Sequence, residues 1–288
     1  MARRERKTFY ERIVTVFGDI LVYPWPLFLL YNPRGYRVRG EDIREVLDVI
    51  RPGDVLVRGY DNYLDGKIIP GYFSHVGLYV GDVTEADALT IAAAGAGAGL
   101  PEAHRVKPGR CMVVHALAEG VLTEDVINFC RCDYMAVLRA PARLAARNPG
   151  WTPVVAEESL DPRERTILTR LRAGEPVEFA EALPLVREAA LGRLGTRYDF
   201  KFDFARLDRL SCSELVYFAM KALGPFLDVA PVNRRMLLFF KRSVIEPDAF
   251  VRSPLELVWK SRSVDGARLA ALRPEGAGPA PAPRAVVA

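Results

Sequence analysis

The stretch Leu-Ser-Cys-Ser-Glu-Leu-Val-Tyr, residues 210–217, predicts a helix with a cysteine at its first position. Ser211 is followed three residues later by Glu214, just before an apolar run, which is the pattern of a capping box. Ser211 is therefore the expected N-cap, and the helix should continue to Gly224. The positive end of a helix dipole favours a thiolate, which predicts a lowered pKa for Cys212. A cysteine that only packs in the core is the alternative interpretation.

His75 begins a predicted strand. Apolar residues alternate with others from Val76 to Val80, and the pattern ends at the turn residues Gly81-Asp82. Gly77 shares a face of this strand with His75 and leaves room there for another group to approach. His75 is thus a candidate base for activating the cysteine.

His115 provides a second strand histidine, in a β-branched stretch that leads to a turn at Glu119-Gly120. The remaining histidine, His104, lies in a polar, loop-like stretch and is expected to be solvated. Two strand histidines and a helix-start cysteine supply a nucleophile, a base and a group that orients the base. Acyl-transfer chemistry requires these three roles.

The chain resembles the circularly permuted papain-like amidases, the YiiX/YebB-like branch of the NlpC-type cysteine hydrolases. The resemblance rests on "RPGDVLVRG" (51–59), "IIPGYFSHVGLYVGD" (68–82), "VVHALAEGV" (113–121) and "YDFKFDF…LSCSELVYFAM" (198–220). It implies an α+β, permuted papain-like (NlpC-type) fold, in which an antiparallel, partly closed sheet packs on the helix that carries the cysteine. The order of histidine before cysteine is that of the permuted branch.

The resemblance also implies a role for each site residue. Cys212 is the nucleophile, His75 the general base, and His115 the residue that orients the base, a position where many members of the family carry a carboxylate. The backbone N–H of Cys212 is a candidate donor to an oxyanion. The lecithin:retinol acyltransferase-like proteins show a similar order of two histidines and a cysteine.

The expected function is that of a cysteine hydrolase of the peptidase or amidase class, which cleaves an amide bond through a Cys212 thioacyl intermediate. The expected substrates are peptides or amides, with cell-wall (peptidoglycan-derived) peptides favoured. One alternative is a lipid acyltransferase or thioesterase of the lecithin:retinol acyltransferase-like type. The other is a non-catalytic, membrane-docked module.

Composition agrees with a globular hydrolase. Of the 288 residues, 50% are hydrophobic and 26% are charged, and the formal net charge is only +4. No basic stripe interleaves with aromatic residues, so nucleic acid is not an expected partner. Four cysteines do not form a disulfide framework at this length, and Cys130-Arg-Cys132 has no second pair for zinc. We expect no cofactor, no metal and reduced thiols, which favour a cytoplasm-facing site in a bacterial cell.

Residues 1–39 form a separate segment in which early cations precede an apolar and aromatic stretch. Asp19, Pro24 and Pro26 interrupt that stretch and make it unsuited to span a bilayer. Two interpretations remain open: peripheral association with a membrane surface, or an arm packed on the domain or on another subunit.

The hydrolase domain is predicted to cover residues 40–263. It contains an Ala/Gly-rich loop insertion at 84–110 and a helical insertion at 143–195, and a mostly disordered tail follows at 264–288. A short amphipathic helix is expected from Gly40 to Ile50.

Within the helical insertion, one helix should run from Asp161-Pro162 to Gly174 and another from Pro184 to Gly195. The stretch "RRMLLFFKR", residues 234–242, fits either a buried helix face or a second membrane contact.

Overall fold

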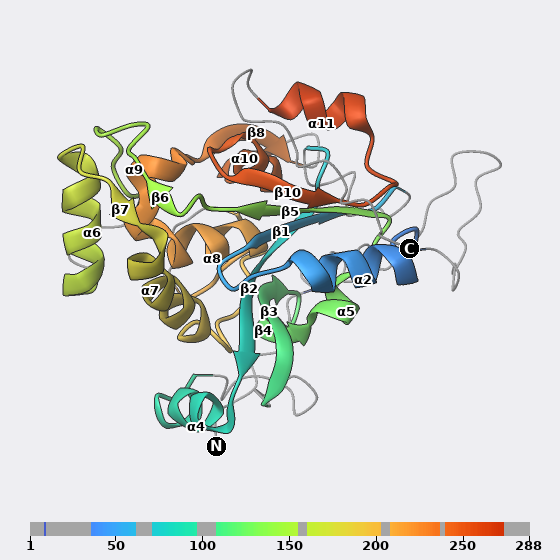
Figure 1. The fold of residues 1–288 in the computed structure, drawn as a ribbon, viewed down its shortest axis with the longest axis horizontal. Coiled ribbons are helices and arrows are strands. Elements are labelled where there is room, and N and C mark those ends of the chain that lie inside the picture. Colours follow the sequence, from blue (N-terminus) through green and yellow to red (C-terminus); the bar gives the residue numbers. More distant parts are fainter. Residues whose placement is uncertain are drawn as a thin grey trace, which may run out of the picture.

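The computed structural model describes Phe9 and residues 36–61, 71–96, 108–154, 160–202, 208–236 and 240–273. A six-stranded antiparallel sheet in the order β10-β5-β1-β2-β3-β4 forms its centre (Figure 1). The strands are β1 (Val55–Gly59), β2 (His75–Val83), β3 (Gly109–Leu117), β4 (Gly120–Asp125), β5 (Tyr134–Arg139) and β10 (Glu256–Lys260). The edge strands β10 and β4 are not paired with each other. The fold belongs to the α+β class.

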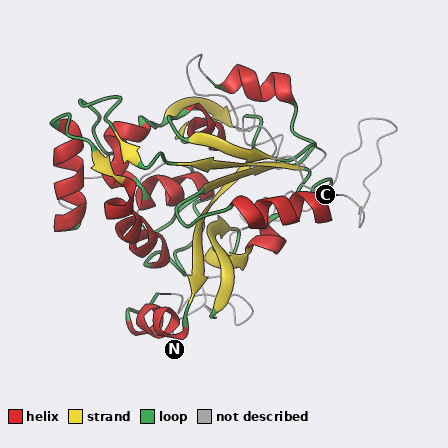
Figure 2. Cartoon of the chain, in the orientation of Figure 1, coloured by secondary structure: helices red, strands yellow, loops and turns green. Residues whose placement is uncertain are grey.

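Helices lie on both sides of this sheet (Figure 2). They are α2 (Gly40–Val49), α4 (Glu85–Ala93), α5 (Val126–Phe129), α6 (Pro162–Arg172), α7 (Phe179–Leu191), α8 (Cys212–Ala219), α9 (Gly224–Leu227), α10 (Pro247–Arg252) and α11 (Gly266–Leu272). A 3-10 turn spans Lys221–Leu223. Two small antiparallel pairs complete the fold: β6 (Arg143–Leu144) with β7 (Val177–Glu178), and β8 (Val232–Met236) with β9 (Phe240–Val244).

Strand alternation divides the core into two clusters, one on each face of the sheet. Val57 and Val76 point to the face covered by α6, α7 and α8. Leu56 and Val113 point to the opposite face, where they pack with residues of α2 and α5. The expected strands at 55–57, 75–82, 115 and 134–138, the helix from Gly40 and the helix from Pro162 are confirmed.

The helix that starts at Cys212 is shorter than the sequence predicts. It ends at Ala219, and Gly224 starts the separate helix α9 with an ordinary φ of −51°. The left-handed residue that ends α9 is Asp228. A Cβ on Gly224 would lie 2.2 Å from the Trp151 ring, so close packing explains this glycine better than helix termination does.

The predicted start of the second insertion helix is also wrong. Helix α7 begins at Phe179, and Pro184 lies inside it. The Phe179 N–H is already bonded to Ala142 O, which fixes the first turn well before the proline.

Two segments predicted to lack structure contain helices. In the loop insertion at 84–110, Thr84 and Asp87 form a capping box for the alanine-rich helix α4. In the tail, Asp265 caps α11, and Leu269 is buried in the core. The rest of the tail and His104 lie outside the described residues.

The stretch 234–242 forms parts of a β-hairpin, which overturns the buried-helix interpretation. Val232 pairs with Val244 and Arg234 with Arg242 across β8 and β9. Because the centre of this stretch lies outside the described residues, the membrane-contact alternative stays a prediction.

The end of the N-terminal segment belongs to the sheet domain. Val38 is buried, and its N–H donates to Cys132 O. The apolar stretch from Ile13 to Tyr31, with its predicted membrane association, lies outside the described residues. Within the described ranges, no helix has the length and hydropathy needed to cross a bilayer.

We predict that Gly224→Ala destabilises the protein by about 1–3 kcal/mol, because the added methyl group would overlap the Trp151 ring. Gly150→Ala is the matched control, since its Cβ would meet only Asn148 Oδ1, at 3.6 Å. Urea denaturation of both variants measures the difference. Equal stabilities of the two variants would show that Gly224 is not required by this contact.

Candidate active site

The two predicted strand histidines are in direct contact. His75 is the first residue of β2, and His115 lies on β3 opposite Gly77. His75 Nε2 and His115 Nδ1 are 2.9 Å apart, and the two rings are nearly perpendicular, at 82°. His115 is fully buried and His75 is 9% exposed. The structure therefore joins the predicted base and its predicted orienting residue.

Gly77 leaves room for this arrangement. A Cβ at Gly77 would lie 2.9 Å from Phe129 Cε2 and 3.2 Å from His115 Cβ. The Phe129 ring packs against both imidazoles, with ring centroids 5.8 Å from His75 and 5.3 Å from His115. The space predicted beside Gly77 is therefore filled by the protein itself.

Glu124 extends the histidine pair. Its Oε2 lies 3.2 Å from His115 Nε2, although the buried N–H is not well aligned with that oxygen. The hairpin between β3 and β4 pairs His115 with Leu122, so Glu124 falls on the same face two residues further along. Our sequence analysis missed Glu124; the turn at Gly120 and the Leu122/Glu124 alternation were the signals that could have found it.

The position of the carboxylate favours one set of tautomers. Burial alone would raise the pKa of Glu124, but the contact with His115 and the charges of Arg58 and Arg131 together lower that pKa, so Glu124 is a carboxylate that accepts hydrogen bonds. His115 Nε2 is then the nitrogen that carries the proton, and His115 Nδ1 accepts from His75 Nε2. His75 Nδ1 keeps the lone pair and is the basic atom of the group.

Both imidazoles are uncharged at neutral pH. Burial, followed by the charge of Arg58, lowers the pKa of His75 well below its ordinary value of 6.5. Burial also lowers the pKa of His115, while the Glu124 contact works in the opposite direction. A neutral His75 can accept a proton, as a general base must.

Cys212 occupies the predicted first position of α8, and the predicted cap is confirmed. The Ser211 N–H donates to Glu214 Oε2 at 2.6 Å, and the Glu214 N–H donates to Ser211 Oγ at 3.4 Å. The N–H of Cys212 belongs to the first helical turn and has no acceptor within the helix. It remains the candidate oxyanion donor.

The prediction of a lowered pKa for Cys212 is wrong in this structure. The thiol is 3% exposed, and burial raises its pKa despite the opposing N–H groups of Val76 and Ser213. The helix terminus does not compensate for the loss of hydration.

The Cys212 thiol contacts the backbone next to His75, but no hydrogen bond joins the sulfur to the imidazole. Val76, whose N–H interacts with the Cys212 thiol, is the residue directly after His75. Among the described residues, neither imidazole forms a hydrogen bond with Cys212 Sγ; the thiol contacts Ser213 Oγ at 4.0 Å. Strand alternation places Val76 and Cys212 on the face covered by α8, whereas His75 and His115 pack on Phe129 at the opposite face, so the cysteine and the histidine pair are adjacent only through the backbone at the start of β2.

The turn before His75 is held by a buried carboxylate. Asp248, on α10, accepts the N–H of Tyr72 at 2.6 Å and that of Phe73 at 2.8 Å. The Ser74 N–H donates to Arg58 O. These bonds fix the direction in which the chain enters β2.

The other cysteines have no comparable surroundings. Cys130 and Cys132 are buried, and burial raises the pKa of Cys130 to about 12. Cys111 is partly exposed at the far end of β3. All four cysteines are free thiols. Among the described residues, no three His, Cys, Asp or Glu side chains form a metal-binding group.

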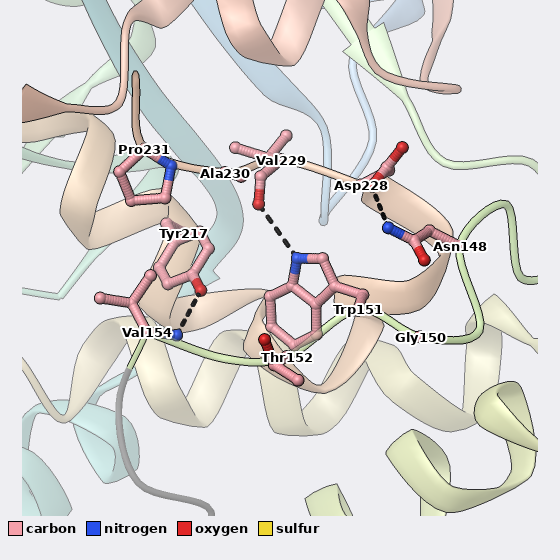
Figure 3. A pocket seen from close by; sticks show the side chains of 10 residues that line it. All are labelled: Asn148, Gly150, Trp151, Thr152, Val154, Tyr217, Asp228, Val229, Ala230 and Pro231. Carbon is pink, nitrogen blue, oxygen red and sulfur yellow. Dashed lines mark hydrogen bonds between the residues drawn. The ribbon is translucent and has the colours of Figure 1, made fainter. Parts of the chain in front are cut away.

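A small pocket of about 200 Å³ lies at the other end of α8, on which Tyr217 is located. Figure 3 shows its polar groups satisfied by one another: Trp151 Nε1 donates to Val229 O, and the Val154 N–H donates to Tyr217 Oη. The pocket is smaller than the roughly 300 Å³ at which ligand sites begin. It is separate from the histidine pair.

We predict that Cys212 reacts slowly with iodoacetamide at neutral pH and that its rate keeps rising above pH 9, because burial raises the thiol pKa. Peptide mass spectrometry after timed alkylation measures each cysteine separately. The partly exposed Cys111 serves as the internal comparison. A midpoint for Cys212 well below about 8.5, the ordinary thiol value, would instead support the lowered pKa predicted from the helix terminus.

Comparison with known proteins does not assign this chain to a family. Comparisons of the chain with protein-family models, with curated protein sequences and with solved structures find no significant match. The functional assignment therefore rests on the arrangement of Cys212, His75, His115 and Glu124.

Proposed function

We propose that the protein is a cysteine hydrolase of the amidase or peptidase class with a permuted papain-like fold. The observation that carries the proposal is the 2.9 Å contact between His75 and His115, one residue along β2 from Val76, whose N–H contacts the Cys212 thiol. A buried imidazole whose second nitrogen is fixed by another ring is a base with a defined orientation. Peptides or related amides, including cell-wall peptides, are the proposed substrates.

The chain order supports the permuted papain-like fold. The histidine strands β2 and β3 precede helix α8, and the core on one face of the sheet contains both Val76 and Cys212. This order and packing are those implied by the resemblance of the sequence motifs.

The proposed reaction begins from a neutral thiol and a neutral imidazole, and it requires the His75 ring to turn at the start of β2 toward the face that carries Cys212. As the Cys212 sulfur attacks the substrate carbonyl carbon, its proton passes to His75 Nδ1 and a carbon–sulfur bond forms. The N–H of Cys212 donates to the resulting oxyanion. The carbon–nitrogen bond then breaks, and the proton on His75 passes to the leaving amine. Water, activated by His75, hydrolyses the thioacyl intermediate and restores the thiol.

His115 and Glu124 would support the charge that forms on His75. When His75 takes up the proton, its Nε2–H···Nδ1 bond to His115 becomes charge-assisted and stronger. Glu124 keeps His115 in the tautomer that can accept this bond. The chain of contacts from His75 through His115 thus ends on a carboxylate, the group that many members of the resembled family carry at the third position.

Capture of a thioacyl intermediate tests the proposal. We expect full-length protein treated with activated amide and ester probes to gain one acyl group on Cys212, detected by intact and peptide mass spectrometry. Cys212→Ser should lose this adduct, while Cys111→Ser, at the partly exposed cysteine, should keep it. The preferred probe separates an amidase from the lipid-ester alternative. Acylation spread equally over all four cysteines, or none at all, would reject the proposal.

We predict unequal effects for the two histidines. His75→Ala should slow acylation about 100-fold to 10,000-fold, which is the usual contribution of a general base. His115→Gln should cost less, because the amide oxygen can still accept the bond from His75 Nε2. Acylation rates measured from quenched time points compare the two variants, and circular dichroism confirms that both are folded. A harmless His75→Ala would remove His75 from the reaction.

A further inference from the structure

Arg58 is a buried cation beside the histidine pair. It lies on β1 directly opposite His75 on β2, in the register Arg58↔His75, and is 6% exposed. Opposite residues in an antiparallel pair have Cβ atoms about 5 Å apart on the same face. The Arg58 side chain therefore lies on the face that carries both imidazoles.

Among the described residues, no carboxylate forms a direct ion pair with the guanidinium, although Glu124 attracts it from a greater distance. Within the described ranges, its only direct hydrogen bond is from Nη1 to Phe129 O, at 2.7 Å, and its buried Nε makes none. The charge lies 4.2 Å from the centre of the Phe129 ring. Burying a charge costs several kcal/mol unless a partner offsets it, and a cation–π contact offsets only part of that cost. A simple packing role would not require a cation at this position.

Phe129 links the cation to the histidines. The same ring contacts Arg58, His75 and His115, so the three side chains are held around one aromatic surface. A second positive charge on either imidazole would lie close to the guanidinium in a region that excludes water. Like charges a few ångströms apart repel strongly there.

We propose that Arg58 is a positioning residue for the histidine pair: its fixed cation disfavours protonation of either imidazole in the resting protein and so excludes the doubly charged state in which the two rings could not be hydrogen-bonded to each other. This inference rests on the proposed function. If His75 and His115 were both protonated, no ring nitrogen could accept the bond between them, and the pair would separate. Arg58 thus preserves a base that can take up the Cys212 proton.

The other titratable groups around the pair do not replace this role. Glu124 on β4 and Glu119 in the turn before it act on His115 in the opposite direction, by favouring its charged form. The thiols of Cys130, Cys132 and Cys212 have pKa values raised by burial and are uncharged at neutral pH. Burial is the largest cause that lowers the pKa of His75 and keeps the ring neutral, and the charge of Arg58 and then that of His115 add to it.

Titration of the histidines by NMR tests the proposal without depending on activity. The chain has three histidines, and single His→Gln variants assign their signals. In Arg58→Gln, the midpoints of His75 and His115 should rise by about one pH unit. In Arg58→Lys, which retains the charge, they should stay low. Arg139→Gln is the matched control, because Arg139 is a partly buried sheet arginine that bonds Asp54 and Val49 O instead.

The fall in the rate of Cys212 acylation at low pH should shift together with the titration midpoints of the histidines. Below the midpoint of His75 in the unchanged protein, Arg58→Gln should acylate up to about tenfold more slowly than the unchanged protein, and the two rates should converge by pH 8. A folded Arg58→Gln with unshifted histidine midpoints would overturn the proposal. If Arg58→Gln does not fold, raised midpoints in Arg58→Lys would overturn it and low midpoints would support it. Shifted midpoints in a protein that never acylates would support the role of Arg58 and reject the hydrolase instead.

Discussion

The hydrogen bond between His75 and His115 is the constraint on which the rest of the site depends. Two imidazoles share such a bond only while one of the facing nitrogens keeps a lone pair. Burial lowers the pKa of His115 and, against the opposing effect of Glu124, keeps a lone pair available for this bond. The strand register places Arg58 beside the pair, Gly77 provides the space, and Phe129 closes it from water. Each of these features would be costly or unnecessary around a single exposed histidine.

Local sequence patterns predicted the elements that carry the site. The capping box at Ser211 placed Cys212 at the first position of a helix, and the alternation after His75 placed that residue at the start of a strand. Each of these two signals is contained within a few consecutive residues and does not depend on the rest of the chain. The end of α8 was predicted incorrectly, because Gly224 serves the packing of Trp151, a residue more than seventy positions away.

The remaining parts of the site depend on strand pairing, which a single sequence does not fix. Glu124 approaches His115 only because the turn at Gly120 sets the register of β3 and β4. Arg58 faces His75 only because β1 and β2 pair as they do, although a long segment separates them in the chain. In the sequence motif that contains it, Arg58 resembles any charged residue near the end of a strand. Its proposed role depends on His75 and Phe129, which strand pairing places next to it.

The competition between the helix terminus and burial decides the resting state of the cysteine. A helix N-terminus stabilises a nearby anion by about 0.3–1 kcal/mol when exposed, whereas removing a thiolate from water costs more when the site is as closed as that of Cys212. The cysteine therefore rests as a thiol and His75 as a neutral imidazole, and in the proposed reaction neither carries a buried charge before substrate binds. Charge would develop only as the new bond forms, when the N–H of Cys212, His115 and Glu124 can each stabilise part of it. A closed site of this kind limits unspecific thiol chemistry while keeping the base available.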